Sequence, residues 1–508
     1  MSYTGTDQRA TKKDWLGLAV LVIPILVVSM DMSVLYLALP FMTADLEPTS
    51  NQSLWILDIY GFLLAGLLIT MGSLGDRIGR RTLLMVGAVV FGVASLAATF
   101  STSPEMLLAA RALLGIGGAT IAPSTLSLIR NMFHDPGQRK EAIGLWTAGF
   151  AGGAAVGPVI GGVLLEHFWW GSVFLINIPI MVLLFVAAPI LVPEFKDADP
   201  GKFDPISVML AISSMLSLVY AIKHGAQEGI DSATILTAVA GLGLGTAFVI
   251  RQRKAANPLI DVTLFAERAF SAAVVVQFLV IFAMTGFSLF AAQYLQLVVG
   301  LGPLEAGLWL LIPAASAATG AVFAPTMSKV IHTGTIIAGG LLFIAFGCAA
   351  LVFVAADSGL PLLLTGMALL TFGIGAASTL NSDIVLTAAA PEKAGAASAL
   401  SETGAELGGA VGIAILGTIG STVYRNRMDD AIPVGTPAEI ADPARETIGG
   451  AIAVADILPE RFGSQLNAVA NSSFIDGFNL AAGWSAGLMA VSAVTVFVLL
   501  RRQTASAR

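Results

Sequence analysis

The chain has 508 residues, of which 56% are hydrophobic and only 12% are charged, with a formal net charge of −7. So few charged side chains cannot cover the surface of a soluble domain of this size. The composition therefore excludes a water-soluble enzyme or a nucleic-acid-binding protein and indicates that lipid surrounds most of the chain. The single cysteine, Cys348, cannot form an intrachain disulfide. We expect an all-α integral membrane protein without a metal or cofactor.

Apolar runs of about 20 residues, the length that spans a bilayer, recur along the whole chain. The predicted spans are 15–39, 54–73, 82–101, 105–129, 140–165, 170–192, 204–222, 232–250, 270–297, 304–328, 334–356, 359–382, 396–424 and 476–500. The sequence therefore predicts fourteen spans. One alternative stays open, because 204–222 and 232–250 could together form one re-entrant hairpin.

Positive charges give the predicted orientation. If both termini are cytoplasmic, one of the 26 Lys and Arg residues lies inside a span, five lie in outer segments and the others lie in inner segments. The outer five are Lys223, Arg425, Arg427, Arg445 and Arg461. This distribution satisfies the positive-inside rule and requires an even number of spans. We expect a multi-pass protein of a bacterial inner membrane, with residues 1–14 as a cytoplasmic N-terminus.

An internal repeat divides the chain. Residues 115–119, 136–142 and 152–157 resemble residues 373–377, 391–395 and 408–412, at offsets of 258, 255 and 256. Spans 4 and 5 thus correspond to spans 12 and 13. The repeat predicts an N-terminal six-helix bundle (15–192), two extra linker helices (204–250) and a C-terminal six-helix bundle (270–500). Repeated halves around a midplane site are typical of alternating-access transporters.

One connection is long. Residues 425–475, on the predicted outer side, carry three prolines followed by short apolar runs. We expect a small, partly helical hairpin there. A mobile loop without a function fits the sequence equally well.

The connection between spans 2 and 3 is rich in glycine and arginine. Its glycines allow a tight turn and close helix approach, and Asp76 can accept hydrogen bonds from a neighbouring helix N-terminus. The arginines can pair with nearby acids. We interpret the segment as a cytoplasmic latch between halves; a positive-inside anchor would explain the arginines but not Asp76. The latch residues are Gly72, Asp76, Arg77, Gly79, Arg80 and Arg81.

Span 5 carries small residues at intervals of four, namely Gly153, Gly157 and Gly161, with Pro158 and Gly162 among them. Small residues at this spacing let two helices approach backbone to backbone, and a proline bends the helix. We interpret the stretch as a seam that seals one face of a transporter. Ordinary tight packing is the alternative.

Away from their ends, the predicted spans contain five charged residues: Asp31, Asp58, Arg111, Glu402 and Glu406. Each such charge costs about 2.5–3.5 kcal/mol on insertion scales and therefore indicates a function. The acids outnumber the one arginine, so not all can be ion-paired. A carboxylic acid without a positive partner in a low dielectric keeps its proton near neutral pH. Because an entering cation can displace that proton, the pattern predicts exchange of protons for cationic substrates.

Each charge has an expected role and an alternative. We expect Asp31, Arg111 and Glu406 to couple transport to protons. Glu402, Glu406 and Asp58 would neutralise the substrate. Alternatively, Asp31 and Arg111 form a structural pair, the glutamates join helices, and Asp58 lies in water at the outer interface.

Aromatic and sulfur side chains near the acids could form an adaptable apolar wall for a lipophilic cation. Core or lipid-facing packing is the alternative for each of them. The residues are Met30, Trp55, Tyr60, Trp146 and Phe287.

Together these motifs resemble the fourteen-span drug:proton antiporters of the major facilitator superfamily, of the QacA, SmvA and LfrA type, over nearly the whole chain. The resemblance implies the major facilitator fold, arranged six, two and six, with alternating access. The glycine stretch of span 5 looks like the antiporter signature of that superfamily. The resemblance also places protonation and cation recognition at acids of spans 1, 2 and 13. Related pumps also carry an acid in span 10, whereas residues 313–320 contain none, which predicts weaker recognition of divalent cations.

We therefore expect a monomeric multidrug antiporter that exports lipophilic cationic drugs, dyes and quaternary ammonium antiseptics in exchange for protons. A proton-coupled exporter of an endogenous metabolite, lipid or siderophore is the second hypothesis. A membrane receptor or scaffold without transport is the third. The sequence contains no nucleotide-binding loop, metal-ligand cluster or appended soluble domain, which disfavours the third hypothesis and an enzymatic activity.

Overall fold

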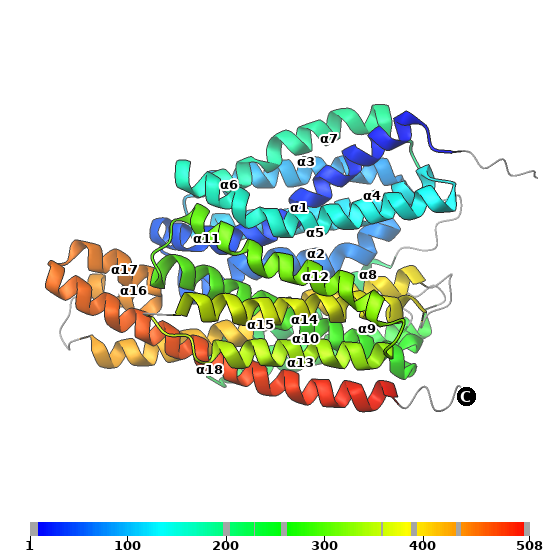
Figure 1. Ribbon diagram of the computed structural model, residues 1–508. Coiled ribbons are helices and arrows are strands. Elements are labelled where there is room, and N and C mark those ends of the chain that lie inside the picture. Colours follow the sequence, from blue (N-terminus) through cyan, green and yellow to red (C-terminus); the bar gives the residue numbers. More distant parts are fainter. Residues whose placement is uncertain are drawn as a thin grey trace, which may run out of the picture.

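The computed structural model describes residues 9–196, 204–227, 229–255, 262–356, 359–387, 394–432 and 438–501. Within these ranges all regular structure is helical. The helices lie side by side along one direction (Figure 1), and fourteen stretches are long and apolar enough to cross a membrane. The predicted all-α membrane class and number of spans are confirmed. Residues 1–8 of the predicted N-terminal segment and Pro391 of the second repeat copy lie outside the described ranges.

Most spans are single helices that extend the predicted ones by a few residues. The first half contains α1 (Lys12–Leu46), α2 (Ser50–Ile78), α3 (Arg80–Thr99), α4 (Pro104–Met132), α5 (Pro136–His167), α6 (Ser172–Leu175) and α7 (Asn177–Leu191). The extra pair is α8 (Pro205–Gln227) and α9 (Ser232–Lys254), followed by the short η1 (Val262–Ala266). The second half contains α10 (Arg268–Gln293), η2 (Tyr294–Val298), α11 (Pro303–Trp309), α12 (Leu311–Met327), α13 (Thr333–Leu351), α14 (Gly359–Thr387), α15 (Ala394–Ala431) and α18 (Glu460–Arg501).

Polar side chains define where helices begin. Thr11 accepts a hydrogen bond from the backbone of Asp14, whose side chain bonds back to the cap, and Thr49 and Gln52 repeat this capping box on α2. Asp135 caps α5 directly before a proline. Each cap satisfies backbone N–H groups that have no partner within the helix. These polar side chains lie at the helix ends, whereas the interiors of the same helices consist mainly of apolar residues.

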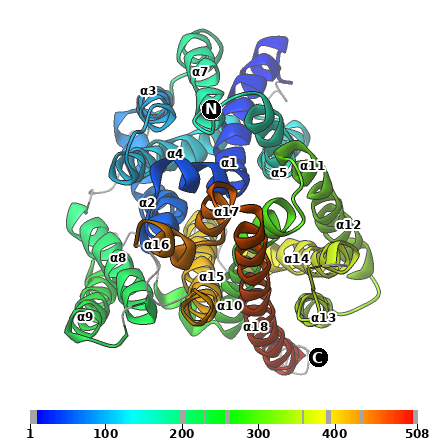
Figure 2. The same ribbon diagram turned by 90° about the vertical axis from the view of Figure 1, so that its left-hand side faces the viewer.

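The helices fall into two halves and a lateral pair (Figure 2). Helices α1–α7 form one half, and α10–α15 with α18 form the other. Helices α8 and α9 pack against each other, and α8 also contacts α2 and α15. Each of the two has 23 residues. Both contain a stretch long enough to cross a membrane separately, which replaces the alternative of one re-entrant hairpin.

The two ends of the bundle differ. Helix α1 begins and α18 ends at one end, called the terminal end below. At the opposite end, called the hairpin end, α16 (Ala438–Glu446) and α17 (Ile448–Ile457) lie across the junction of the two halves (Figures 1 and 2). These two helices occupy the segment 425–475, where a partly helical hairpin is expected from the sequence; residues 433–437 lie outside the described ranges.

The glycines of α5 allow close contact with α1. A Cβ atom at Gly153 would collide with the carbonyl oxygen of Leu26, and one at Gly161 would lie 2.8 Å from a methyl carbon of Val34. Gly157 faces Met30 in the same way, at 3.1 Å. Only glycine permits this backbone approach along the whole contact.

The other face of α5 joins the two halves. A Cβ atom at Gly162 would lie 2.6 Å from the Pro303 carbonyl oxygen of α11, and Gly307 of α11 packs on the Pro158 carbonyl. In addition, Gln296 Nε2 donates to the Leu37 carbonyl of α1 at 3.2 Å. These contacts between the halves lie toward the hairpin end.

Adjacent glycines of α5 provide a matched test of this packing. Gly153→Ala forces α1 and α5 apart and is expected to lower the free energy of unfolding by about 1–3 kcal/mol. Gly152→Ala meets no atom within 4 Å, so it is expected to leave stability unchanged or slightly raised. Thermal unfolding of the two purified variants measures the difference. Equal melting temperatures would show that the α1–α5 contact does not depend on glycine.

Candidate functional site

The first half contains a buried ion pair, formed by Asp31 of α1 and Arg111 of α4. Arg111 Nη1 donates to Asp31 Oδ2, and both side chains are almost completely excluded from solvent. Arg111 Nε donates to the Ile56 carbonyl of α2 at 3.2 Å. Its guanidinium carbon also lies 4.6 Å from the centre of the Tyr60 ring. The positive charge of Arg111 is therefore matched by one carboxylate, one carbonyl and one aromatic face.

Two polar residues that the sequence analysis did not single out complete this cluster. Asn177 of α7 donates its Nδ2 to Asp31 Oδ1 at 3.3 Å and lies 3.1 Å from the Ser95 hydroxyl of α3. Asn177 is fully buried. In the sequence, Asn177 stands out as a polar residue within the apolar run that starts at Ser172. Nothing in the sequence, however, indicates that its partner is Asp31.

The glutamate pair, Glu402 and Glu406, lies on α15 in the second half. The two carboxylates interact electrostatically. Glu406 approaches α2 so closely that a Cβ atom at Gly61 would lie 3.0 Å from its Oε2. Glu402 is surrounded by protein yet exposed to solvent, as expected for a side chain that faces an opening between helices.

The glutamate pair has no positively charged partner among the residues that the structure describes. Among the residues that the structure describes, no Lys, Arg or His forms an ion pair with Glu402 or Glu406, and neither carboxylate has a hydrogen-bond donor. Their electrostatic situation is therefore opposite to that of Asp31, which has its own arginine.

Tyrosine side chains lie between the two sites. Tyr36 of α1 interacts electrostatically with Asp58, Glu406 and Arg111. Tyr60 interacts with Arg111 and Glu406, and its hydroxyl donates to the Val28 carbonyl at 3.1 Å. The predicted charged residues thus share one electrostatic neighbourhood, in which Asp58 is buried rather than at a wet interface.

The remaining apolar candidates lie in helix contacts. Trp55 packs on Phe62 and on Tyr220 of α8, with ring centres 6.1 and 6.5 Å apart. Met30 lies in the α1–α5 contact. Phe287 is fully buried against other phenylalanines of the second half.

Trp146, like Trp55, is only partly buried. It lies on α5, where it stacks on Phe150 and donates its Nε1 to the Thr125 hydroxyl at 3.0 Å.

The predicted latch segment forms a tight turn at the terminal end. Gly79, at φ +111°, ends α2 and begins α3. This left-handed conformation favours glycine. Asp76 pairs with Arg80 one turn later, at 2.6 Å. Asp76 was expected to accept hydrogen bonds from the N-terminus of a neighbouring helix. At the N-terminus of α3 the acceptor is instead Glu194, whose carboxylate accepts from the backbone N–H of Arg81 at 2.8 Å and of Thr82 at 3.1 Å.

Glu194 could not be predicted from the sequence, because its position after the last apolar residue of α7 gives no sign that α3 begins beside it. The described contacts of Asp76, Arg80 and Arg81 all lie within the first half. The predicted role of this segment as a latch between the halves remains a prediction.

Comparison with known proteins gives the family. The family model for the Major Facilitator Superfamily matches residues 21–413. The multidrug efflux pump LfrA of Mycolicibacterium smegmatis is 41% identical over 499 residues, which are 98% of this chain and 99% of that protein. The methyl viologen resistance protein SmvA of Salmonella typhimurium is 35% identical over 506 residues, covering 96% of this chain and 99% of that one.

Solved structures of transporters share the fold. A bacterial homolog of the human lysosomal transporter Spinster, inward-facing and unoccupied, matches with a TM-score of 0.68 at 15% identity, over 97% of this chain and 98% of that one. A peptide transporter POT in complex with sulfate gives 0.63 at 16% identity, over 98% and 97%. The motifs, the fourteen apolar helices and these matches agree, and the chain belongs to the major facilitator superfamily.

Proposed function

We propose that this protein exports lipophilic cationic drugs, dyes and quaternary ammonium compounds in exchange for protons. The observation that carries the proposal is the glutamate pair, which lacks a positive partner among the described residues although it lies inside the bundle. Burial of unpaired carboxylates favours their protonated form, whereas an apolar cation in the same place favours the ionised form. Proton and cation therefore compete for the same two groups.

The names of the relatives support this direction of transport. LfrA is named a multidrug efflux pump and SmvA a methyl viologen resistance protein. A protein of Streptomyces glaucescens that is 31% identical over 497 residues is named a tetracenomycin C resistance and export protein. Export of more than one kind of compound agrees with a site that selects by charge and apolar character rather than by directed hydrogen bonds.

The buried ion pair has a separate role in the proposed cycle. When Asp31 takes up a proton, Arg111 loses its charged partner and its positive charge acts on Tyr60 and on Glu406 beyond it. Asn177 holds Asp31 in place through its amide. Protonation in the first half is thus transmitted to the acids of the second half without direct contact between the carboxylates.

The cycle also needs a direction across the membrane. We infer that the protein lies in the bacterial inner membrane as a monomer. Its terminal end faces the cytoplasm, because the basic residues concentrate in segments at that end. The hairpin end then faces outward. Rocking of the two halves about the site exposes the acids to each side in turn.

Proton release tests the exchange directly. Addition of tetraphenylphosphonium to the purified protein in weak buffer is expected to release protons, which a pH-sensitive dye detects. Glu402→Gln/Glu406→Gln is expected to abolish this release, because a side-chain amide does not ionise and therefore has no proton to release when a cation binds. Glu460→Gln, at an exposed carboxylate outside the site, is the matched control and is expected to behave as the parent. Full release by the double variant would contradict the assignment of the glutamates.

Transport itself is measured in everted membrane vesicles. Ethidium uptake is expected in vesicles that contain the protein and a proton gradient, and a protonophore is expected to collapse it. Absence of uptake of any tested lipophilic cation would overturn the proposed function.

A double-variant cycle separates coupling from packing at the buried ion pair. Arg111→Met leaves Asp31 buried without its cation and is expected to cost about 3–5 kcal/mol of stability. Asp31→Asn/Arg111→Met is expected to recover most of that loss in thermal unfolding, yet to lack proton-driven efflux. Efflux at the parental rate by the stable double variant would mean that the pair is purely structural.

A further inference from the structure

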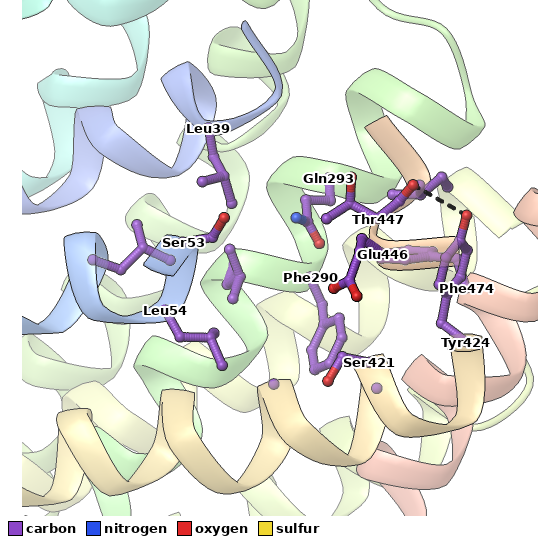
Figure 3. Close-up of a pocket in the computed structure, with 15 residues that line it drawn as sticks. Leu39, Ser53, Leu54, Phe290, Gln293, Ser421, Tyr424, Glu446, Thr447 and Phe474 are labelled. Atoms are coloured by element: carbon purple, nitrogen blue, oxygen red, sulfur yellow. Dashed lines mark hydrogen bonds between the residues drawn. The ribbon is translucent and has the colours of Figure 1, made fainter. Parts of the chain in front are cut away.

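A small cavity lies between the two halves at the hairpin end (Figure 3). Helices α1 and α2 of the first half and α10, α15 and α18 of the second half form its walls, and the α16–α17 connection covers it. The space that water can enter is about 100 Å³, and the cavity is partly open to solvent. Pockets for drug-sized ligands enclose about 300–1,000 Å³, so this cavity is too small for a lipophilic cation.

The cavity is suited to water instead. A water molecule inside a protein needs on the order of 10–15 Å³ of such space and polar partners for its hydrogen bonds. The polar side chains in the walls are Ser53, Gln293, Ser421, Tyr424, Glu446 and Thr447. The cavity therefore has both the room and the hydrogen-bonding groups for several water molecules from the adjoining solvent.

Helix α2 leads from the cavity to the buried acids. Leu54 lines the cavity, and Asp58 lies one helical turn deeper on the same face of α2. Gly61 follows on that face, and a Cβ atom there would lie 3.0 Å from Oε2 of Glu406. From the hairpin end inward, the order along the contact of α2 with α15 is therefore the cavity, Leu54, Asp58 and Glu406.

Leu54 closes the way from the cavity to Asp58. Its side chain extends from α2 toward α15 (Figure 3), where a Cβ atom at Gly417 would lie 3.1 Å from a δ carbon of Leu54. Leu54 is only 7% exposed, and Leu57, which also lines the cavity, is 8% exposed. Such an apolar constriction excludes water and so interrupts a chain of water molecules along which protons move.

Beyond this constriction, solvent approaches the acids from the opposite direction. Glu402 lies one turn before Glu406 in α15, nearer to the terminal end, and is exposed to solvent. Solvent thus reaches the cavity on one side of Leu54 and the glutamate pair on the other side. Without the constriction, protons would cross the bundle while no cation is exported.

We propose that the cavity is a water-filled entry chamber for protons, and that Leu54, packed against Gly417, is the apolar seal between this chamber and Asp58. The inference rests on the proposed exchange of cations for protons and adds the route by which protons enter. Because α2 and α15 belong to different halves, movement of the halves separates Leu54 from Gly417 and lets water reach Asp58. The chamber places water beside the seal while the exported cation is still excluded.

A proton leak in the absence of any exported cation tests the seal. The purified protein is placed in liposomes with a pH-sensitive dye and a potassium diffusion potential, negative inside. Leu54→Asn is expected to let protons enter several-fold faster than the parent, because its amide binds water. Leu416→Asn is the matched control, since Leu416 is also buried in α15 but faces Gly286 of α10. A leak in both variants, or in neither, would refute the seal.

A second substitution tests the route. Leu54→Asn/Asp58→Asn is expected to leak as slowly as the parent, because the first proton acceptor beyond the seal no longer ionises. An undiminished leak in this double variant would exclude Asp58 from the route and overturn the proposal. Leu54→Ala, which widens the constriction without burying an amide, replaces Leu54→Asn should thermal unfolding show that the latter melts below the assay temperature.

Silver ions test whether the chamber contains water. Cys348→Ala/Ser421→Cys carries one thiol, in the cavity wall. Silver binds the thiolate and blocks labelling by a maleimide after denaturation. The block is expected to form several-fold faster than in Cys348→Ala/Ser485→Cys, whose thiol is buried in α18 outside the cavity. Equal rates would show that the cavity is dry and would contradict its role as an entry chamber.

These measurements involve no exported cation and are therefore separate from the tests of transport. Absence of ethidium uptake together with the expected leak and silver reaction would refute the proposed export and leave the chamber and its seal standing. Proton-driven ethidium uptake without either of them would support the export and refute the chamber.

Discussion

The balance of charge inside the bundle governs how this protein is built. An ionised side chain removed from water is costly unless an opposite charge lies beside it. Asp31 meets this requirement through Arg111, and the surrounding helices add a carbonyl, an aromatic face and the amide of Asn177. Glu402 and Glu406 have no such partner among the described residues. The first half thus holds a balanced pair and the second half an unbalanced one, with tyrosines between them.

The packing of the helices is matched to this arrangement. Gly153 and Gly157 bring α1, which carries Asp31, onto α5 at backbone distance. The opposite face of α5 meets α11 of the second half through Gly162. Helix α5 therefore packs on α1, which carries Asp31, and also contacts α11 of the second half. A displacement of α11 thus acts on α5, the helix that lies against Asp31's own helix. Close-packed contacts of this kind shift as units rather than deform gradually.

The sequence predicted the spans and the charged residues well but not the directions of side chains. Apolar length alone identified all fourteen helices, because a bilayer tolerates few alternatives. The charges stood out because they are rare in such segments, and the Asp31–Arg111 pair was foreseen as an alternative. The ring contacts of Trp55 with Tyr220 of α8 and of Phe287 with Phe478 could not be predicted, because helix rotation is decided by neighbouring helices that no local pattern reveals. The place of both residues in a substrate wall stays a prediction.

The position of the extra helices makes access from the lipid unequal on the two sides of the molecule. Helix α8 contacts both α2 and α15 and so covers the line along which the two halves meet on that flank, while α9 lies outside it and has few buried residues. On this flank, a compound dissolved in the hydrocarbon layer therefore contacts α8 and α9 before it reaches the line between the two halves. On the opposite flank, α5 and α11 meet, and the described part of the chain has no further helix pair outside them (Figure 2). On that flank the junction is closed instead by the backbone contact of α5 with α11 at Gly162 and Gly307.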